Sequence, residues 1–304
     1  MSDTELRGSG SSHGYHYLNL FQSCQWKFHL RYNHLLVPRL LSRYLIFGQV
    51  IHLVAEAFYK GLPTARDCAG LESLFVFELT RRRQFYEKSD DFIDDLERGP
   101  VMLRKWYDTF ASRDFEENEI LAVEETMVFS LPGGYEMTVK PDVVMRRREN
   151  GLIYCHEHKT TSRSASEMAK RVACEMQADA QILGTNVWLA AAAPGSPLYG
   201  LDCRGVVPDI LYKRQSVCTA TRDTVVSRTR KELGDAQLTF AGIFSDIATK
   251  RASLDEGVVP ELLYARNGGW CGNFGCEYSA ICRTRYDSVP PGFLKADEGV
   301  EDEV

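Results

Sequence analysis

One β-hairpin constrains the fold of this 304-residue chain more than any other feature of its sequence. Residues 135–147 and 152–159 are rich in β-branched and apolar side chains, and Glu149, Asn150 and Gly151 lie between them. Asn-Gly between two such runs favours a tight turn joining antiparallel strands. A third run, residues 119–130, precedes Pro132-Gly133-Gly134, so the three runs predict an antiparallel meander.

Segments with helical periodicity lie before and after this meander in the sequence. Apolar residues recur at spacings of three and four, which is typical of amphipathic helices. Pro100 lies early in the predicted helix at residues 91–110, so that helix could instead begin at the proline. The expected helices are residues 18–32, 43–59, 71–86, 91–110, 166–193 and 221–248, with a further strand at residues 205–212. Helices, a hairpin sheet and then helix–strand–helix indicate an α/β or α+β core.

Composition excludes several classes of protein. The net charge is −6 and hydrophobic residues make up 44%, which is ordinary for a globular chain and not for a disordered one. No apolar run approaches the roughly 18–20 residues that a bilayer-spanning helix needs. Residues 1–17 are polar and lack an apolar signal core, so we expect a cytoplasmic protein with no membrane partner. In a reducing compartment, nine cysteines are better explained as thiols or metal ligands than as disulfides.

The two strands of the hairpin carry charged residues at their open end. If the turn lies at residues 149–151, Asp142 pairs near residue 158, beside Glu157 and Lys159. Side chains alternate along a strand, so Glu157 and Lys159 share one face and His158 faces away. Two converging carboxylates favour a hard divalent cation, and a nearby lysine can stabilise a phosphorane-like transition state. The alternative is an ion network on the surface of a hairpin.

Two further helices carry polar residues within apolar stretches. His52 lies in Gly48-Gln49-Val50-Ile51-His52, with Glu56 one turn later. A lone histidine of this kind could equally be a core residue. Gln177 and Gln181 lie one turn apart in the helix after Lys159, where a solvent-facing pair is the alternative explanation.

Three of the nine cysteines are clustered. Cys271, Cys276 and Cys282 lie within the Gly-rich segment WCGNFGCEYSAIC, and Cys24 could join them. Thiolates on a short irregular segment can converge on a metal without regular structure. The remaining cysteines are scattered over separate predicted elements.

Taken together, these segments resemble the RecB-like branch of the PD-(D/E)XK nuclease superfamily. The resemblance extends from about residue 18 to 285 and follows the family's order of motifs. The matching segments are FQSCQWKFHL, GQVIHLVAE, PDVV, EHK, QILGTNVW, GVVPDILYKR and WCGNFGCEYSAICR.

The resemblance implies a restriction-endonuclease-like α/β core, with a mixed central sheet flanked by helices, that acts on DNA. His52, Asp142, Glu157 and the backbone carbonyl of His158 would hold Mg²⁺ or Mn²⁺, with Glu56 a candidate additional ligand. Lys159 would position or activate the attacking water. Gln181 would lie near the substrate strand, and Lys213 would be the basic residue that ends the following strand.

Relatives with this complement of cysteines include nuclease domains of AddB-type helicases and CRISPR-adaptation nucleases, which hold a [4Fe–4S] cluster. The resemblance implies that Cys24, Cys271, Cys276 and Cys282 are its ligands. The usual spacing in those families is C-x2-C-x5-C, whereas the first gap here is four residues, which leaves zinc as an alternative. Thr185 also stands where many relatives carry tyrosine.

The resulting expectation is a nuclease, acting on DNA ends or single strands, built from five parts. These are a polar tail (1–17), a helical region (18–118), a nuclease core (119–250), a cysteine-rich segment (251–290) and an acidic tail (291–304). A helicase, recombination or CRISPR-adaptation partner is possible. The competing interpretations are a non-cleaving DNA-binding or assembly module with the same fold and a zinc-stabilised structural protein.

Overall fold

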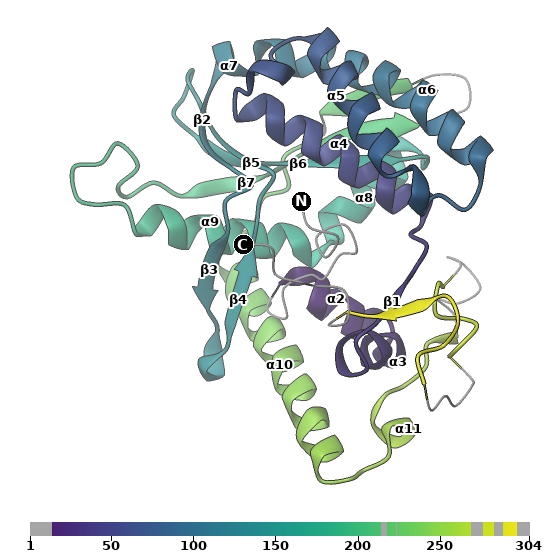
Figure 1. Ribbon diagram of the computed structural model, residues 1–304. Helices are drawn as coiled ribbons and strands as arrows, with labels where there is room; N and C mark the ends of the chain where they lie inside the picture. Colours follow the sequence, from purple (N-terminus) through teal and green to yellow (C-terminus); the bar gives the residue numbers. More distant parts are fainter. Residues whose placement is uncertain (1–13, 214–217, 223, 269–275, 283–287, 297–304) are drawn as a thin grey trace. The chain divides into compact units, whose positions relative to one another are not determined.

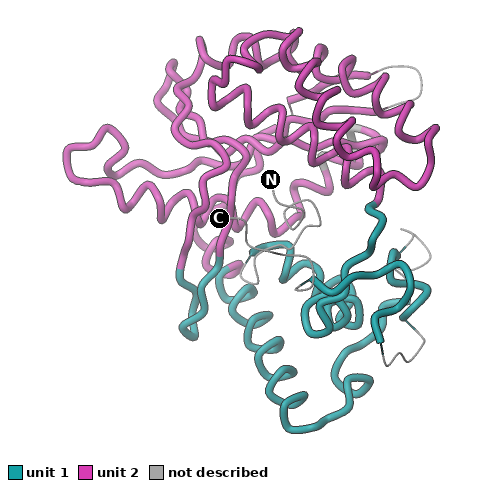
Figure 2. Tube along the Cα trace, viewed as in Figure 1, with its two compact units in different colours: residues 1–41, 130–137, 237–304 teal, residues 42–129, 138–236 magenta. Residues whose placement is uncertain are grey.

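The computed structural model describes residues 14–213, 218–222, 224–268, 276–282 and 288–296. The chain divides into two compact units, coloured separately in Figure 2. Unit 1 comprises residues 1–41, 130–137 and 237–304, and unit 2 comprises residues 42–129 and 138–236. The outer parts of both predicted tails, residues 1–13 and 297–304, lie outside the described residues.

Unit 2 is built on a five-stranded mixed sheet in the order β2-β5-β6-β7-β8 (Figure 1). Its neighbouring strands are antiparallel except for β6 and β7, which are parallel. The strands are β2 (Asn118–Val123), β5 (Val143–Arg147), β6 (Ile153–Thr161), β7 (Cys203–Lys213) and β8 (Cys218–Arg222). The mixed central sheet with flanking helices expected from the sequence is therefore confirmed.

The predicted hairpin is formed by β5 and β6. Val143 pairs with His156 and Arg146 with Ile153, and Gly151 adopts a positive φ of 71° in the turn. Glycine suits this conformation because it has no Cβ to clash. This register brings the beginning of β5 beside Glu157 and His158, as the pairing argument expects.

The two long strands predicted around the hairpin are each broken into two. Residues 119–130 form β2 and then β3 (Met127–Ser130), whereas residues 135–147 form β4 (Glu136–Val139) and then β5. β3 and β4 pair with each other as a separate two-stranded sheet. The chain therefore leaves the central sheet between Val123 and Met127 and returns between Val139 and Val143.

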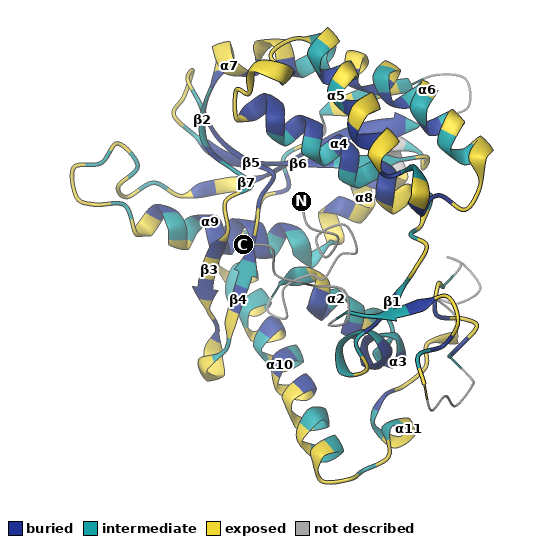
Figure 3. Ribbon diagram, in the orientation of Figure 1, coloured by how far each residue is buried: buried dark blue, intermediate teal, exposed yellow. Residues whose placement is uncertain are grey.

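Helices cover both faces of the central sheet of unit 2. α4 (Arg43–Tyr59), α5 (Cys68–Arg81) and α6 (Ser89–Trp106) form one group, in which α4 contacts β6 and α6 contacts β7 and β8. A short π-helical segment (Tyr107–Ala111) and α7 (Ser112–Glu117) follow α6. On the other face, α9 (Met176–Ala190) packs on β6 and β7. Figure 3 shows that α4 and the central strands are largely buried.

In unit 2, α4 and α6 follow their predicted ranges, α5 begins three residues before its predicted start, and one predicted helix is divided in two. α6 begins at Ser89 and continues through Pro100, so the helix does not begin at the proline. Gly99 lies beneath Phe75 of α5, and a Cβ at this position would fall 2.0 Å from the phenylalanine ring. The predicted helix 166–193 is instead two helices, α8 (Ala165–Cys174) and α9, because Glu175 between them has an extended backbone.

Unit 1 joins segments from both ends of the chain. β1 (Leu36–Pro38) pairs antiparallel with β9 (Phe293–Lys295). The helices at the N-terminal side are α2 (Tyr15–Ser23), α3 (Gln25–Phe28) and a π-helical turn (His29–Asn33). α10 (Arg230–Asp255), of which residues 237–255 belong to this unit, and α11 (Pro260–Leu263) come from the C-terminal part.

Two predicted helices near these segments differ from the structure. The single helix expected at residues 18–32 is interrupted at Cys24, which has an extended backbone with φ −161° and ψ 104°. The helix expected at 221–248 begins at Arg230, because residues 218–222 form β8 at the edge of the sheet. No helix in the described ranges is long and apolar enough to cross a membrane.

Candidate active site

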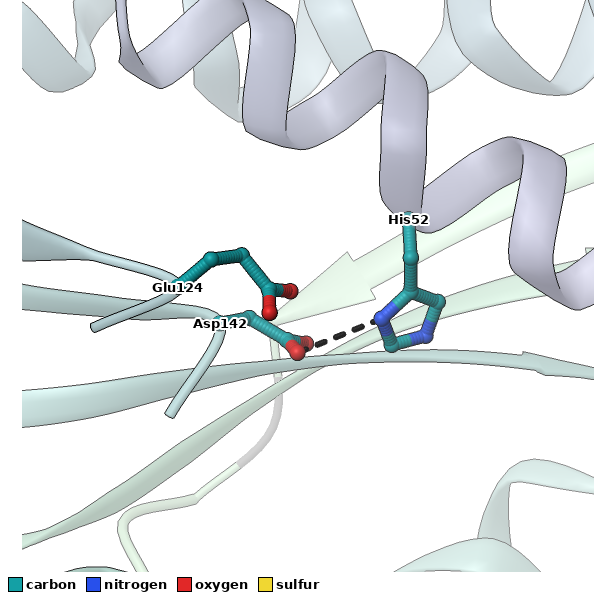
Figure 4. Close-up of side chains that lie close together, drawn as sticks. All are labelled: His52, Glu124 and Asp142. Atoms are coloured by element: carbon teal, nitrogen blue, oxygen red, sulfur yellow. Dashed lines mark hydrogen bonds and ion pairs between the residues drawn. The ribbon is translucent and has the colours of Figure 1, made fainter. Parts of the chain in front are cut away.

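His52, Glu124 and Asp142 form a group that could hold a metal ion (Figure 4). Each offers one ligand atom, and these atoms all lie within 4.8 Å of one another. His52 Nδ1 donates to Asp142 Oδ1 across 3.2 Å. One imidazole nitrogen and two carboxylates therefore converge in unit 2 from three separate elements.

The backbone explains why these three side chains meet. His52 projects from α4, and the two acids lie where β2 and β5 leave the central sheet. Val123 pairs with Val143, so Glu124 is opposite Asp142, and Glu124 N donates to Asp142 O across 3.0 Å. Glu124 has φ 51°, a left-handed conformation that is uncommon for a residue other than glycine. Such strained residues are often found at functional sites.

The charges at this group fit a divalent cation. Burial, together with the neighbouring Asp142 carboxylate, raises the pKa of Glu124 to about 7. Burial alone would lower the pKa of His52, but the Asp142 carboxylate outweighs this effect and raises that pKa to about 9. Without a metal ion, a proton on His52 thus partly neutralises the negative charge of Glu124 and Asp142. A hard cation with oxygen and imidazole ligands would neutralise them directly.

Glu157 and Lys159 lie on the opposite face of β6 from His158, as the alternation of side chains predicts. Lys159 Nζ is 2.8 Å from Glu157 Oε1. Both residues contact α9. Gln177 Nε2 and Gln181 Nε2 each donate to Glu157, and Lys159 Nζ donates to Gln177 Oε1 across 2.6 Å. His158 instead packs toward α4 and α6.

The pKa of Lys159 bears on its chemical role. Burial lowers this pKa, but the Glu157 and Glu175 carboxylates outweigh burial and raise it above its ordinary value of 10.5. Lys159 therefore carries a positive charge at neutral pH. A half-buried ammonium of this kind is suited to binding an anionic group and not to accepting a proton.

Asp142 and Glu157 belong to one electrostatic neighbourhood, although each has its own partners. Asp142 Oδ2 accepts from the backbone N–H of His158 at 2.6 Å and also from His158 Nδ1 at 3.2 Å. Both carboxylates raise the pKa of His52. Glu157 lies outside the group formed by His52, Glu124 and Asp142.

Two other residues singled out from the sequence have partners of their own. Glu56 Oε1 accepts from Lys60 Nζ across 2.6 Å, one turn later on α4. Lys213, at the end of β7, pairs with Asp95 and lies 3.7 Å from Asp94. Its ammonium also lies 4.5 Å from the centre of the Phe47 ring.

The cysteines proposed from the resemblance are only partly described. Cys271 lies outside the described residues, whereas Cys24, Cys276 and Cys282 are half-buried in unit 1. Cys24 lies between α2 and α3, and its Sγ accepts from Lys27 N across 3.5 Å.

Glu124 is the candidate ligand that the sequence reasoning missed. Its position depends on the break between β2 and β3, whereas the sequence analysis treated residues 119–130 as one strand. The available signal was a pair of acids, Glu124 and Glu125, in the middle of an otherwise apolar strand prediction. An interruption of this kind can mark the point where a strand ends.

Comparison with protein families identifies the fold to which this site belongs. A family model described as the PD-(D/E)XK nuclease superfamily matches residues 15–283. The chain belongs to the PD-(D/E)XK nuclease superfamily. Its members are metal-dependent nucleases that hydrolyse phosphodiester bonds in DNA, so a nuclease is the coarse functional class of this chain.

Comparisons with individual proteins add little to this assignment. No curated protein matches the chain. A solved structure titled "Crystal structure of SSO0001" shares 12% sequence identity, with 75% of this chain and 84% of that chain covered. Its TM-score is 0.29, which is too low to support an argument.

Proposed function

We propose that this superfamily member is a divalent-metal-dependent DNA nuclease of the RecB-like branch, with His52, Asp142 and Glu157 at its catalytic centre. The observation that carries the proposal is the convergence of His52, Glu124 and Asp142 within 4.8 Å, beside the Glu157–Lys159 pair. A surface ion network is a poorer explanation, because Asp142 and Glu157 are both less than 10% exposed.

The residues divide into distinct roles. His52, Asp142 and Glu157, with the backbone carbonyl of His158, are the proposed ligands of Mg²⁺ or Mn²⁺, and Glu124 is added to this set. When bound, such an ion polarises a phosphoryl oxygen and favours hydroxide at neutral pH. Lys159, held as an ammonium, orients the attacking water and stabilises negative charge that develops on the phosphoryl oxygens.

The glutamines of α9 support this arrangement. Gln177 bridges the proposed catalytic pair, because Lys159 Nζ donates to its Oε1 across 2.6 Å while its own Nε2 donates to Glu157. Gln181 is the proposed contact to the substrate strand, a role in which its amide would have to turn away from Glu157, because its side chain is only 1% exposed. Lys213 is the second proposed contact to the substrate strand. To bind a phosphate there, its ammonium would have to leave its ion pair with Asp95.

The proposal includes a [4Fe–4S] cluster held by Cys24, Cys271, Cys276 and Cys282, with zinc as the alternative. The contacts within unit 1 support it, because the turn that contains Cys24 is joined to the C-terminal segment. Trp26 N donates to Ala265 O across 3.0 Å. Arg266 lies over the Trp26 ring at 4.1 Å, and its Nε donates to Cys282 O across 3.0 Å.

A cleavage assay tests the function directly. End-labelled linear single-stranded and double-stranded DNA, and circular DNA of both kinds, are incubated with Mg²⁺, Mn²⁺ or EDTA. We expect cleavage with either metal, none in EDTA, and preference for linear substrates if the enzyme acts on ends. Asp142→Asn should cleave about 10²–10³-fold more slowly than wild type, whereas Glu149→Gln, another change of a carboxylate to an amide, in the exposed hairpin turn, should retain activity.

Two outcomes would contradict the proposal. DNA binding without cleavage under all metal conditions would favour a non-cleaving assembly module. Equal activity of Asp142→Asn and the wild type would show that cleavage does not occur at this site.

A further inference from the structure

A row of buried polar side chains crosses the sheet of unit 2 on the face covered by α4 and α6. His158 on β6 pairs in register with Asp209 on β7, which in turn pairs with Arg222 on β8. His158 and Asp209 are 1% and 0% exposed. Buried charges are costly unless they are paired, and none of the chemistry proposed for Lys159 or Glu157 requires this row.

At the end of this row farthest from His158, Arg222 forms hydrogen bonds with two carboxylates. Arg222 Nε and Nη2 donate to the two oxygens of Asp209 across 2.7 and 2.8 Å. The same guanidinium donates to both oxygens of Asp114, from α7, across 2.7 and 2.9 Å. Asp114 also accepts from the hydroxyl of Tyr59 across 2.6 Å. Two bidentate contacts fix the orientation of Asp209, because the planar guanidinium holds both carboxylates in defined geometry.

His158 joins this row to the candidate metal site. Its Nδ1 is within hydrogen-bond distance of Asp142 Oδ2, at 3.2 Å, whereas its Nε2 faces Asp209 Oδ2 at 3.8 Å, beyond hydrogen-bond distance. A carboxylate only accepts hydrogen bonds, so Nδ1 carries the hydrogen toward Asp142. The ring is enclosed by Tyr59 and Trp106, whose ring centroids lie 5.7 and 5.6 Å away. Asp142 Oδ2 is thereby held, while Oδ1 remains directed at His52.

We infer that the His158 side chain, packed between Tyr59 and Trp106, is a positioning residue for Asp142. The inference rests on the proposed function only in treating Asp142 as a metal ligand. Ligating carboxylates are commonly oriented by hydrogen bonds from neighbouring groups, and loss of such a partner typically weakens metal binding about 10–100-fold.

Direct measurement of Mn²⁺ binding to the full chain tests this role without relying on cleavage. His158→Leu removes the donor to Asp142 but retains apolar volume, whereas His158→Asn retains an N–H donor near the position of Nδ1. We expect His158→Leu to raise the Mn²⁺ Kd about 10–100-fold and His158→Asn to recover most of the affinity. Melting temperatures in EDTA report whether each variant is folded.

The outcomes separate this inference from the proposed function. A wild-type Kd in His158→Leu, or an equal loss in both His158 variants, overturns the positioning role and leaves the nuclease proposal standing. Dependence of Mn²⁺ binding on His158 without any DNA cleavage by the wild type supports the positioning role and overturns the nuclease proposal. A wild type that binds no Mn²⁺ overturns both. If His158→Leu does not fold, His158→Phe, which retains the planar ring and removes the donor to Asp142, must raise the Kd in the same direction, and an unchanged Kd refutes the inference.

Discussion

Replacing Glu124 by glutamine should raise the free energy of unfolding when no metal is present. With metal bound, the variant should be less stable than the wild type. Glu124 lies opposite Asp142, and burial together with that carboxylate raises its pKa from the ordinary 4.5 to about 7. One pKa unit corresponds to about 1.4 kcal/mol, so keeping Glu124 ionised in the folded protein costs up to about 3 kcal/mol.

The sign of the pH dependence follows from this raised pKa. The folded protein holds the Glu124 proton more tightly than the unfolded chain, so the free energy of unfolding falls as pH rises from 4.5 toward 7. The full destabilisation is present above pH 7. Glutamine has the same shape and does not ionise. Its stabilising effect should therefore be near zero at pH 4.5 and reach about 1–3 kcal/mol at pH 8.

Denaturant unfolding in EDTA at both pH values measures the first half of the prediction. Adding Mn²⁺ should reverse the order, because a ligand at 100 times its Kd stabilises the folded state by about 2.7 kcal/mol, and the variant binds less tightly. Glu125→Gln, the same change at the adjacent exposed residue, is the matched control. A Glu124→Gln protein no more stable than wild type in EDTA at pH 8, or with the same response to Mn²⁺, would refute the reasoning.

Three further predictions concern other parts of the molecule. Asp142→Asn and Lys159→Met should each slow DNA cleavage by about 10²–10³-fold without loss of fold, and rates within about tenfold of wild type would argue against the catalytic assignment. Cys24→Ala should lose iron and acid-labile sulfide after anaerobic purification, whereas Cys174→Ala, at an exposed position, should retain both; zinc without sulfide would replace the cluster by a zinc site. Burial lowers the pKa of His29 to about 4, so the folded state resists its protonation and stability should fall as pH drops from about 6.5 toward 4. His29→Gln should flatten this part of the melting-temperature profile, and an unchanged slope would show that another group is responsible.

Local sequence signals predicted the hairpin and its neighbouring helix well. The Asn150-Gly151 turn sets the register of β5 and β6 through contacts near in sequence, and the apolar periodicity of residues 43–59 predicts the bounds of α4. The pairing across the turn also predicted that Asp142 lies near Glu157 and His158. These features depend on backbone preferences and side-chain alternation, which a single sequence contains.

The features that the sequence analysis missed depend on contacts between distant segments. Glu124 reaches the site only because β2 ends there and the chain leaves the central sheet for the β3–β4 pair. The short strand β8 lies in a segment whose beginning was expected to be loop and whose end, from residue 221, was expected to be helix. It is a strand because Asp209 and its neighbours on β7 pair with it. The polar row from His158 to Arg222 follows from these pairings and has no local signature.

The pairing of β1 with β9 has a consequence for folding during synthesis. Leu36 is made early, its partner Lys295 is made much later, and the whole of unit 2 emerges from the ribosome between them. At about 5–20 residues per second, the first strand waits on the order of tens of seconds for its partner. During this interval Trp26, which is buried in the finished protein, lacks Arg266, whose guanidinium lies over its ring. A chain whose synthesis stops after unit 2 would thus have a complete central sheet and a partly uncovered Trp26, the kind of apolar surface that chaperones bind.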